Sequence, residues 1–163
     1  MNRLITSWSE PAVVPGDIPE DKVTLSNQSD RGGYPSVWAN APMNAYVDSW
    51  GMYSRQSVSY VAFKVHQAYG SMPYWGGVGN ANQWPSNARA AGIPTGTTPK
   101  VGSVGVVSSG IYGHVAWAEA VNPNGTLRVS HYNVDWSGNY AVWDNLSPSY
   151  FDTYIYFGEW SQG

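Results

Sequence analysis

The sequence predicts an α+β fold, with helices in its first half packed on an antiparallel sheet of about five or six strands. Apolar residues recur at a helical period over residues 57–69, and after residue 99 the apolar pattern changes to a period of two. The chain has 163 residues, of which 42% are hydrophobic, which suits one domain with a core of its own.

The first 30 residues differ from the rest of the chain. They are polar, carry Pro11, Pro15 and Pro19, and show little periodicity. We therefore expect an extended arm or linker over residues 1–30 and the folded domain over residues 31–163. The start of the chain lacks a charged segment followed by an apolar one, so we expect no signal peptide, and no apolar run approaches the length of a membrane span.

The helix expected over residues 57–69 has one apolar stripe, and Gly70 supplies its end. Ser57 stands at its start, where it is either a helix cap or a reactive group at a nucleophile position. The stripe consists of Val58, Val61, Ala62 and Val65.

The flanking segments are less regular. Residues 31–56 are rich in turns and aromatic residues, which indicates irregular structure with a short helix, and residues 79–92 allow a short helix broken near Pro85. The expected strands cover residues 103–107, 114–121, 126–133, 139–143 and 153–158.

The loop Asn122–Gly125, with the sequence NPNG, predicts a hairpin in which Val121 faces Thr126. An opposite-charge pair across the strands would support this register. The register sets three further pairs opposite each other: Glu119 with Arg128, His114 with Asn133, and Ala116 with His131.

One face of this hairpin carries mainly small apolar residues, so we expect the helix to pack against it. At the end away from the loop this face carries His114, His131 and Asn133, where the helix start would meet them. Each of these residues alone is more commonly structural, and His66 fits a solvated helix position. Two histidines without an acidic neighbour make a weak metal site, so we expect no metal and no cofactor.

The composition narrows the function further. Charged residues are 12% of the chain, the net charge is −3 and there is no basic patch, so nucleic acid is not an expected partner. The 9 Trp and 12 Tyr indicate either an aromatic groove for saccharides or peptides, or an aromatic core. Tyr132 and Trp136 flank the polar end and would line such a groove or pack on the sheet. There is no cysteine, which excludes disulfides, thiolate metal sites and a cysteine nucleophile.

Five segments occur along the chain in the order RQSVSYVAFKV, GNANQW, PKVGSVGVV, YGHVAWAEAV and VSHYNVDWSGNY. This ordered set resembles a CHAP domain, the cysteine- and histidine-dependent amidohydrolase/peptidase family of the papain-like NlpC/P60 superfamily. The resemblance covers roughly residues 48–140 and implies a papain-like fold.

The resemblance implies a role for each site residue. Ser57 stands where the family has its nucleophilic cysteine, and His114 in GHVA matches the catalytic histidine. His131 takes the place of a Glu or Gln, and Asn133 matches the family's asparagine. Because a neutral imidazole stabilises an imidazolium less than a carboxylate does, we expect Asn133 to be the principal residue that orients His114.

The oxyanion of the reaction would be held by two donors. The backbone N–H of residue 57 is one, and Gln56 or Tyr53 is the candidate for the other. Asp48 has no spaced set of acids around it, so a calcium loop is not expected.

The family implies cleavage of an amide bond in bacterial peptidoglycan, as an N-acetylmuramoyl-L-alanine amidase or a peptide endopeptidase. We therefore expect a monomeric domain of an autolysin or phage lysin that acts at the cell wall or outside the cell. Ser57 admits three interpretations: a Cys→Ser substitution that keeps binding without turnover, a natural homologue with little activity, and a working Ser–His–Asn hydrolase. A non-catalytic wall-binding or interaction module on the same scaffold is the alternative function.

Overall fold

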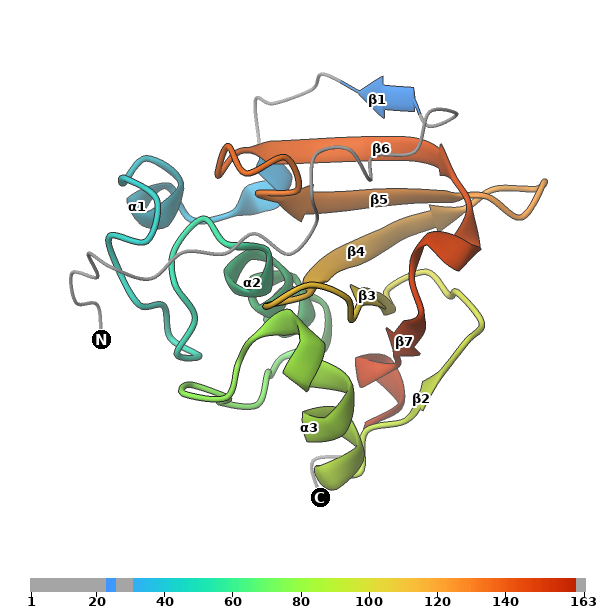
Figure 1. Ribbon diagram of the computed structural model, residues 1–163, viewed down its shortest axis with the longest axis horizontal. Helices are drawn as coiled ribbons and strands as arrows, with labels where there is room; N and C mark the ends of the chain where they lie inside the picture. Colours follow the sequence, from blue (N-terminus) through green and yellow to red (C-terminus); the bar gives the residue numbers. More distant parts are fainter. Residues whose placement is uncertain (1–22, 26–30, 161–163) are drawn as a thin grey trace.

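The predicted α+β class is confirmed. The computed structural model describes the backbone of residues 23–25 and the chain from residue 31 to 160. Its strands form one antiparallel sheet of seven strands in the order β1-β6-β5-β4-β3-β7-β2 (Figure 1), and β1 and β2 lie outside the five predicted strand ranges. The strands are β1 (Val23–Leu25), β2 (Thr95–Gly96), β3 (Val104–Val107), β4 (His114–Val121), β5 (Leu127–Tyr132), β6 (Tyr140–Leu146) and β7 (Thr153–Ile155).

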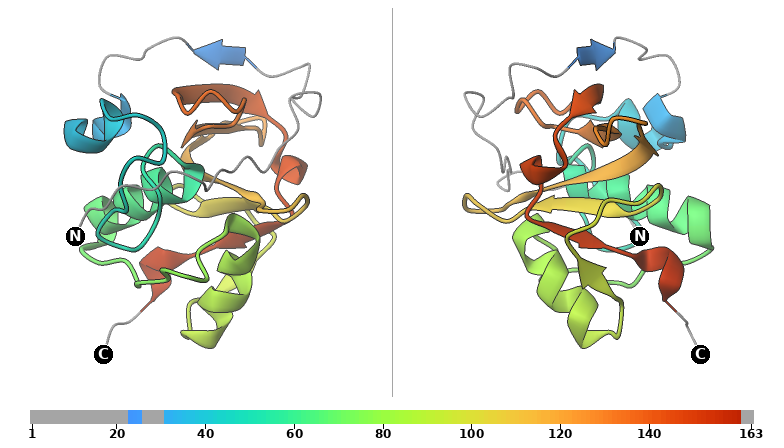
Figure 2. Two further views of the ribbon diagram at one scale, coloured as in Figure 1. Left: turned by 60° about the vertical axis from the view of Figure 1, so that its left-hand side comes forward. Right: turned by 90° about the vertical axis from the view of Figure 1, so that its right-hand side faces the viewer.

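Three α-helices accompany this sheet in the described residues. They are α1 (Ser36–Ala39), α2 (Ser57–Tyr69) and α3 (Trp84–Ala90). Helix α2 packs on β4 and β5, whereas α3 packs on β2 and β7 (Figures 1 and 2). Short 3-10 helices cover Arg31–Gly33, Ala81–Gln83, Pro148–Tyr150 and Phe157–Glu159.

The extended arm expected over residues 1–30 falls almost entirely outside the described residues. The exception is β1, whose three residues pair with β6 at one edge of the sheet. None of the helices in the described part of the chain combines the length and the apolar character that crossing a membrane requires.

Helix α2 has the predicted bounds. Gly70 ends it in the left-handed conformation, with φ of 84°, and its N–H donates to the carbonyl of His66. Gln56 is the N-cap residue and Ser57 is the first helical residue, so the interpretation of Ser57 as a helix cap is wrong. The valine and alanine side chains of the predicted stripe are at most 2% exposed.

The predicted packing face of the hairpin is wrong. The valine stripe of α2 packs with Val115, Trp117 and Tyr132, which lie on the face opposite His114 and His131. Larger apolar side chains on that face fill the space against the helix. A buried hydrogen bond of 2.7 Å between the hydroxyls of Tyr60 and Ser130 further ties α2 to β5.

The face with the histidines is buried by aromatic residues instead of a helix. Trp143, Tyr150, Phe151 and Tyr154 follow one another with ring centroids 5.1–5.8 Å apart, and three of them pack with Ala116 and Val129 in a second core cluster. Because β6 and β7 lie on opposite sides of β3–β5, these rings close the sheet over the histidines.

The predicted hairpin register is correct at Trp117 and Ala118 and wrong near the loop. Trp117 pairs with Ser130 as predicted, but a bulge at Glu119 shifts the pairing, so that Ala120 faces Arg128. Arg128 therefore forms its ion pair with Asp144 on β6, at 3.0 Å.

The Glu119 side chain turns to the hydroxyl of Ser130, which donates to it at 2.6 Å.

Pro85 is also placed differently from the prediction. It lies in the first turn of α3, where a proline begins a helix without loss of a hydrogen bond, and does not break it.

Candidate active site

Two buried histidines meet at one end of the sheet. His114 is the first residue of β4 and His131 lies near the end of β5, and they are 1% and 0% exposed. The Nε2 atom of His114 lies 3.0 Å from the Nδ1 atom of His131, which is a hydrogen bond. The ring of Trp143 packs edge-on against His131, with centroids 4.6 Å apart, and so holds the pair from the core side.

Burial keeps the imidazole of His114 uncharged. It lowers the pKa of His114 to about 3, so this imidazole is neutral at neutral pH. A hydrogen bond between two imidazoles needs one N–H and one lone pair. If Nε2 of His114 carries the hydrogen and donates it to His131, the lone pair of His114 lies on Nδ1, where it can accept a proton.

Asn133 is held differently from the prediction. His114 shares its described hydrogen bond with His131, whereas the Nδ2 atom of Asn133 donates to Oε1 of Gln56 at 2.8 Å. Asn133 has a left-handed backbone, with φ of 62°, which asparagine tolerates better than most residues. The asparagine therefore links the end of β5 to the residue before α2.

Ser57 lies at the start of α2 and is 0% exposed. It follows Gln56, so the link through Asn133 brings the start of α2 to the end of the sheet that carries the histidines. A helix start offers unpaired backbone N–H groups and a partial positive charge, which favour a developing anion. This is the position that a nucleophile with an ionised sulfur requires.

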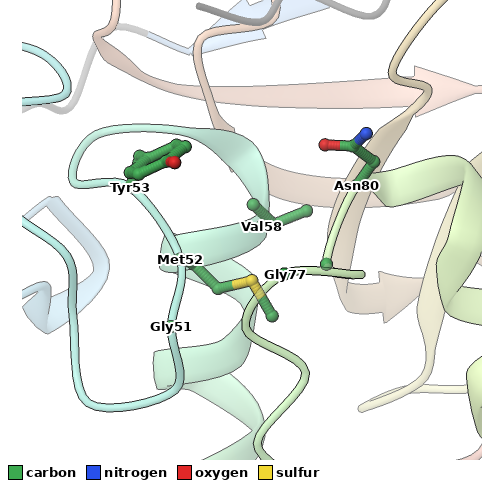
Figure 3. Close-up of a pocket in the computed structure, with 7 residues that line it drawn as sticks. Gly51, Met52, Tyr53, Val58, Gly77 and Asn80 are labelled. Atoms are coloured by element: carbon green, nitrogen blue, oxygen red, sulfur yellow. The ribbon is translucent and has the colours of Figure 1, made fainter. Parts of the chain in front are cut away.

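A pocket of about 140 Å³ opens beside this helix start. Tyr53 and Asn80 lie on either side of Val58, the residue after Ser57, and Met52 and Gly77 form the wall below them (Figure 3). A second pocket, along the same loops, shares three residues with the first, so the two form a groove between the segments 47–53 and 74–80. The shared residues are Gly51, Tyr53 and Gly77.

The four remaining candidate residues lie on the groove wall, in the interior or on the surface. Tyr53 lies on the wall of the groove, whereas the amide of Gln56 is buried and bonded at both ends. Tyr132 is 1% exposed and packs among Tyr34, Tyr60 and Tyr140, which agrees with its packing alternative. Trp136 is 48% exposed on the turn after Asn133.

Asp48 is a buried carboxylate that organises one wall of the groove. Its Oδ1 atom accepts the backbone N–H groups of Trp50 and Met52, both at 2.9 Å. Burial raises its pKa to about 6, although the Ser59 hydroxyl and these amides oppose the shift. Its charge therefore changes within a pH range that proteins meet.

The sequence did not reveal the role of Asn44, or the way in which Asp48 holds the groove loop. Asn44 lies in the irregular segment before the groove loop, and no periodicity or motif marks it. Across residues 31–160, His, Asp and Glu side chains form no group of three that would hold a metal ion.

The fold and the site define a papain-like α+β domain in which the start of a helix is tied to the end of a sheet that carries two histidines. The family model of the CHAP domain matches residues 47–133, which is more than half of the chain. The chain therefore belongs to the CHAP domain family.

Two relatives and one solved structure resemble the chain. Staphylococcal secretory antigen SsaA of Staphylococcus aureus is 37% identical over 100 residues, which are 61% of this chain and 37% of that protein. Staphylococcal secretory antigen ssaA2 of the same species is 33% identical over 116 residues, which are 71% and 42%.

The solved structure is an N-acetylmuramoyl-L-alanine amidase from Staphylococcus aureus. It has a TM-score of 0.55 and 28% identity, and covers 63% of this chain and 30% of its own. The matched regions thus span less than half the length of each of these three proteins.

Proposed function

We propose that the domain acts on bacterial peptidoglycan and that its site is built to hydrolyse an amide bond through a nucleophile at position 57. The hydrogen-bonded pair His114–His131 carries this proposal, because a neutral imidazole whose second nitrogen is held by a partner is the arrangement of a general base. The solved relative supports it, since its name states an amidase that cuts the N-acetylmuramoyl–L-alanine bond.

The reaction follows from these positions when residue 57 is a cysteine. The thiol gives its proton to Nδ1 of His114, and the sulfur attacks the amide carbonyl carbon. The C–N bond then breaks, and His114 returns the proton to the leaving amine. Water hydrolyses the thioester, which releases the acid and restores the thiol. The backbone N–H of residue 57 stabilises the oxyanion.

Serine at position 57 weakens each step. A serine hydroxyl is far less acidic than a thiol, so it needs a stronger base in the transition state. Burial lowers the pKa of His114 to about 3 and makes it a poor base for a hydroxyl. We infer that the chain binds its substrate and turns it over slowly or not at all.

The groove supports an uncharged stretch of substrate beside the nucleophile. Its walls carry Gly51, Gly76 and Gly77 and the rings of Tyr53 and Tyr74, and among the described residues that line it the one charged side chain is the buried Asp48. Glycine walls leave room for a peptide backbone, and tyrosines suit peptide or sugar surfaces. The groove thus fits either bond that peptidoglycan offers, the lactyl amide or a peptide bond.

We propose secretion to the cell wall, which the names of the two antigens support. The second candidate function is a non-catalytic wall-binding module. Serine at position 57 favours it, because a serine lacks the thiol on which the family's mechanism depends.

Digestion of purified peptidoglycan separates the two functions. The chain is compared with Ser57→Cys and with Ser57→Cys carrying His114→Ala, and the released fragments are weighed by mass spectrometry. Only the Ser57→Cys variant should release fragments, and their masses distinguish an amidase from an endopeptidase. If no variant releases fragments while all of them sediment with the wall, the binding module is the better account.

A further inference from the structure

Three buried amide side chains form a continuous chain of hydrogen bonds under the start of α2. The backbone N–H of Gly138 donates to Oδ1 of Asn133 at 2.8 Å, and Nδ2 of Asn133 donates to Oε1 of Gln56 at 2.8 Å. The Nε2 atom of Gln56 in turn donates to Oδ1 of Asn44 at 2.6 Å. The three side chains are 6%, 0% and 1% exposed for Asn44, Gln56 and Asn133.

The chain has a single direction. The amides of Asn133 and Gln56 each accept from the residue before and donate to the residue after, so that a 180° flip of the Gln56 amide would set nitrogen against nitrogen and oxygen against oxygen. Buried polar groups lose more when unpaired than exposed ones do, and linked bonds polarise one another. The orientation of Gln56 is therefore fixed by both neighbours.

This chain of hydrogen bonds joins three parts of the site that are distant in sequence. Gln56 precedes Ser57, and Asn133 follows His131 by two residues. Asn44 precedes the groove loop, and its backbone N–H donates to the carbonyl of Ser54 at 3.0 Å. A shift of any one of these segments would break a buried hydrogen bond, so the chain sets the distance between the nucleophile position and the histidine strand.

The backbone at both ends of the chain is specialised. Asn44 and Asn133 have φ of 65° and 62°, in the left-handed region where asparagine is the commonest residue after glycine. Both residues are thus placed by their backbone as well as by their side chains.

We propose that Asn44 and Gln56 are positioning residues, which hold the nucleophile at residue 57 in line with His114 through the chain to Asn133. The proposal rests on the proposed function of the site. It also reassigns Gln56, because a side chain with one N–H committed to Asn44 and its oxygen committed to Asn133 acts on the nucleophile through the backbone that follows it.

The sequence offers a sharp test, because it has no cysteine. The Ser57→Cys variant therefore holds a single thiol, and its pKa is obtained from the rate of alkylation by iodoacetamide at a series of pH values, read as a mass increase. A thiolate stabilised by a well-placed helix start has a pKa below the ordinary value of about 8.5. A displaced thiol returns toward that value.

Three variants are added to Ser57→Cys. Asn44→Gly removes the acceptor and tolerates the left-handed backbone, Asn44→Asp keeps the acceptor and tolerates the same backbone, and Gln56→Met keeps the side-chain length without hydrogen bonds. We expect Asn44→Gly and Gln56→Met to raise the thiol pKa by about one unit and to lower kcat about tenfold with KM unchanged. Asn44→Asp should stay near the parent.

The result that overturns the proposal is a thiol pKa and a kcat in Asn44→Gly equal to those of Ser57→Cys, with circular dichroism showing the same fold. Asn44→Gly decides the matter if Gln56→Met does not fold, because it removes one hydrogen bond and keeps the backbone. Failure of the proposed function is distinguishable. In that case Ser57→Cys releases no wall fragments, while the alkylation profiles still report whether the amide chain positions residue 57.

Discussion

The Nε2 atom of His114 and the Nδ1 atom of His131 are joined by a hydrogen bond of 3.0 Å between two buried rings. Neither ring has a carboxylate among its described partners. The protein therefore orients its candidate base with an imidazole instead of a carboxylate, which offers less electrostatic support to an imidazolium.

The first prediction concerns this support. In the Ser57→Cys background, His131→Ala should lower kcat by at least about tenfold, because His114 loses the partner that orients it. His131→Glu should retain activity and move the acid limb of the pH–rate profile to higher pH, because a carboxylate stabilises the imidazolium and His114 must be neutral to accept the thiol proton. Peptidoglycan turnover measured across pH values tests both expectations.

His66 is the matched control for these variants. It is the third histidine of the chain and lies exposed on α2, with its ring near Trp50. His66→Ala should leave the pH–rate profile unchanged. An unaltered profile in His131→Glu as well would show that His131 does not act on His114.

Local patterns predicted the elements but not their packing. The bounds of α2 and β4 follow from the helical and alternating periods, which depend on neighbours in sequence. The face of the sheet that receives α2 depends on how large side chains from β6 and β7 cover the other face, and no local pattern contains that information. The bulge at Glu119 also depends on a distant residue, because Arg128 pairs with Asp144 on β6 instead of with Glu119.

The site shows the same division. The hairpin register predicted that His114, His131 and Asn133 lie together, and the resemblance gave these residues and Ser57 their roles. The structure joins the two histidines directly. The sequence did not reveal the partner of Asn133, because its hydrogen bond with Gln56 spans 77 positions of sequence. Asn44 could be found only from its place in the fold, next to Gln56.

The second prediction uses the buried carboxyl of Asp48. Burial raises its pKa from 3.8 to about 6, so the native state takes up a proton more readily than the unfolded chain does between these values. The stability that this group contributes is therefore lost as pH rises from about 4 to 6. Asp48→Asn keeps an oxygen for the two backbone N–H groups, and we expect it to raise the free energy of unfolding at pH 7 by up to about 3 kcal/mol.

His114 acts in the opposite sense. Burial lowers its pKa from 6.5 to about 3, so the unfolded chain binds the proton more readily, and stability is lost as pH falls through this range. The two slopes oppose each other between about pH 4 and 6 in the unchanged chain. In Asp48→Asn only the slope from His114 remains.

Urea unfolding followed by tryptophan fluorescence at several pH values measures these slopes. The unchanged chain should show a shallow dependence on pH between 4 and 6, whereas Asp48→Asn should become steadily less stable toward acid. Parallel curves for the two proteins would mean that Asp48 ionises normally in the folded state.

The third prediction concerns Gly113, which precedes His114. Its φ is 74°, and a Cβ atom there would lie 2.5 Å from the backbone nitrogen of Asn82 and 2.8 Å from the carbonyl oxygen of Val107. Both obstacles are backbone, so β4 or the 3-10 helix at Ala81–Gln83 must move. Gly113→Ala should lower the free energy of unfolding by about 2–4 kcal/mol and, in the Ser57→Cys background, reduce turnover by displacing His114.

Gly125 in the hairpin loop is the matched control, because a substitution there meets backbone strain but no steric clash. Its φ of 86° resembles that of Gly113, but a Cβ atom there meets nothing within 4 Å. Gly125→Ala should therefore cost only about 1 kcal/mol, which is the price of a left-handed alanine, and should leave turnover unchanged. Equal losses of stability in the two variants would show that the segment before His114 yields easily, and that close packing against Asn82 does not hold the base in place.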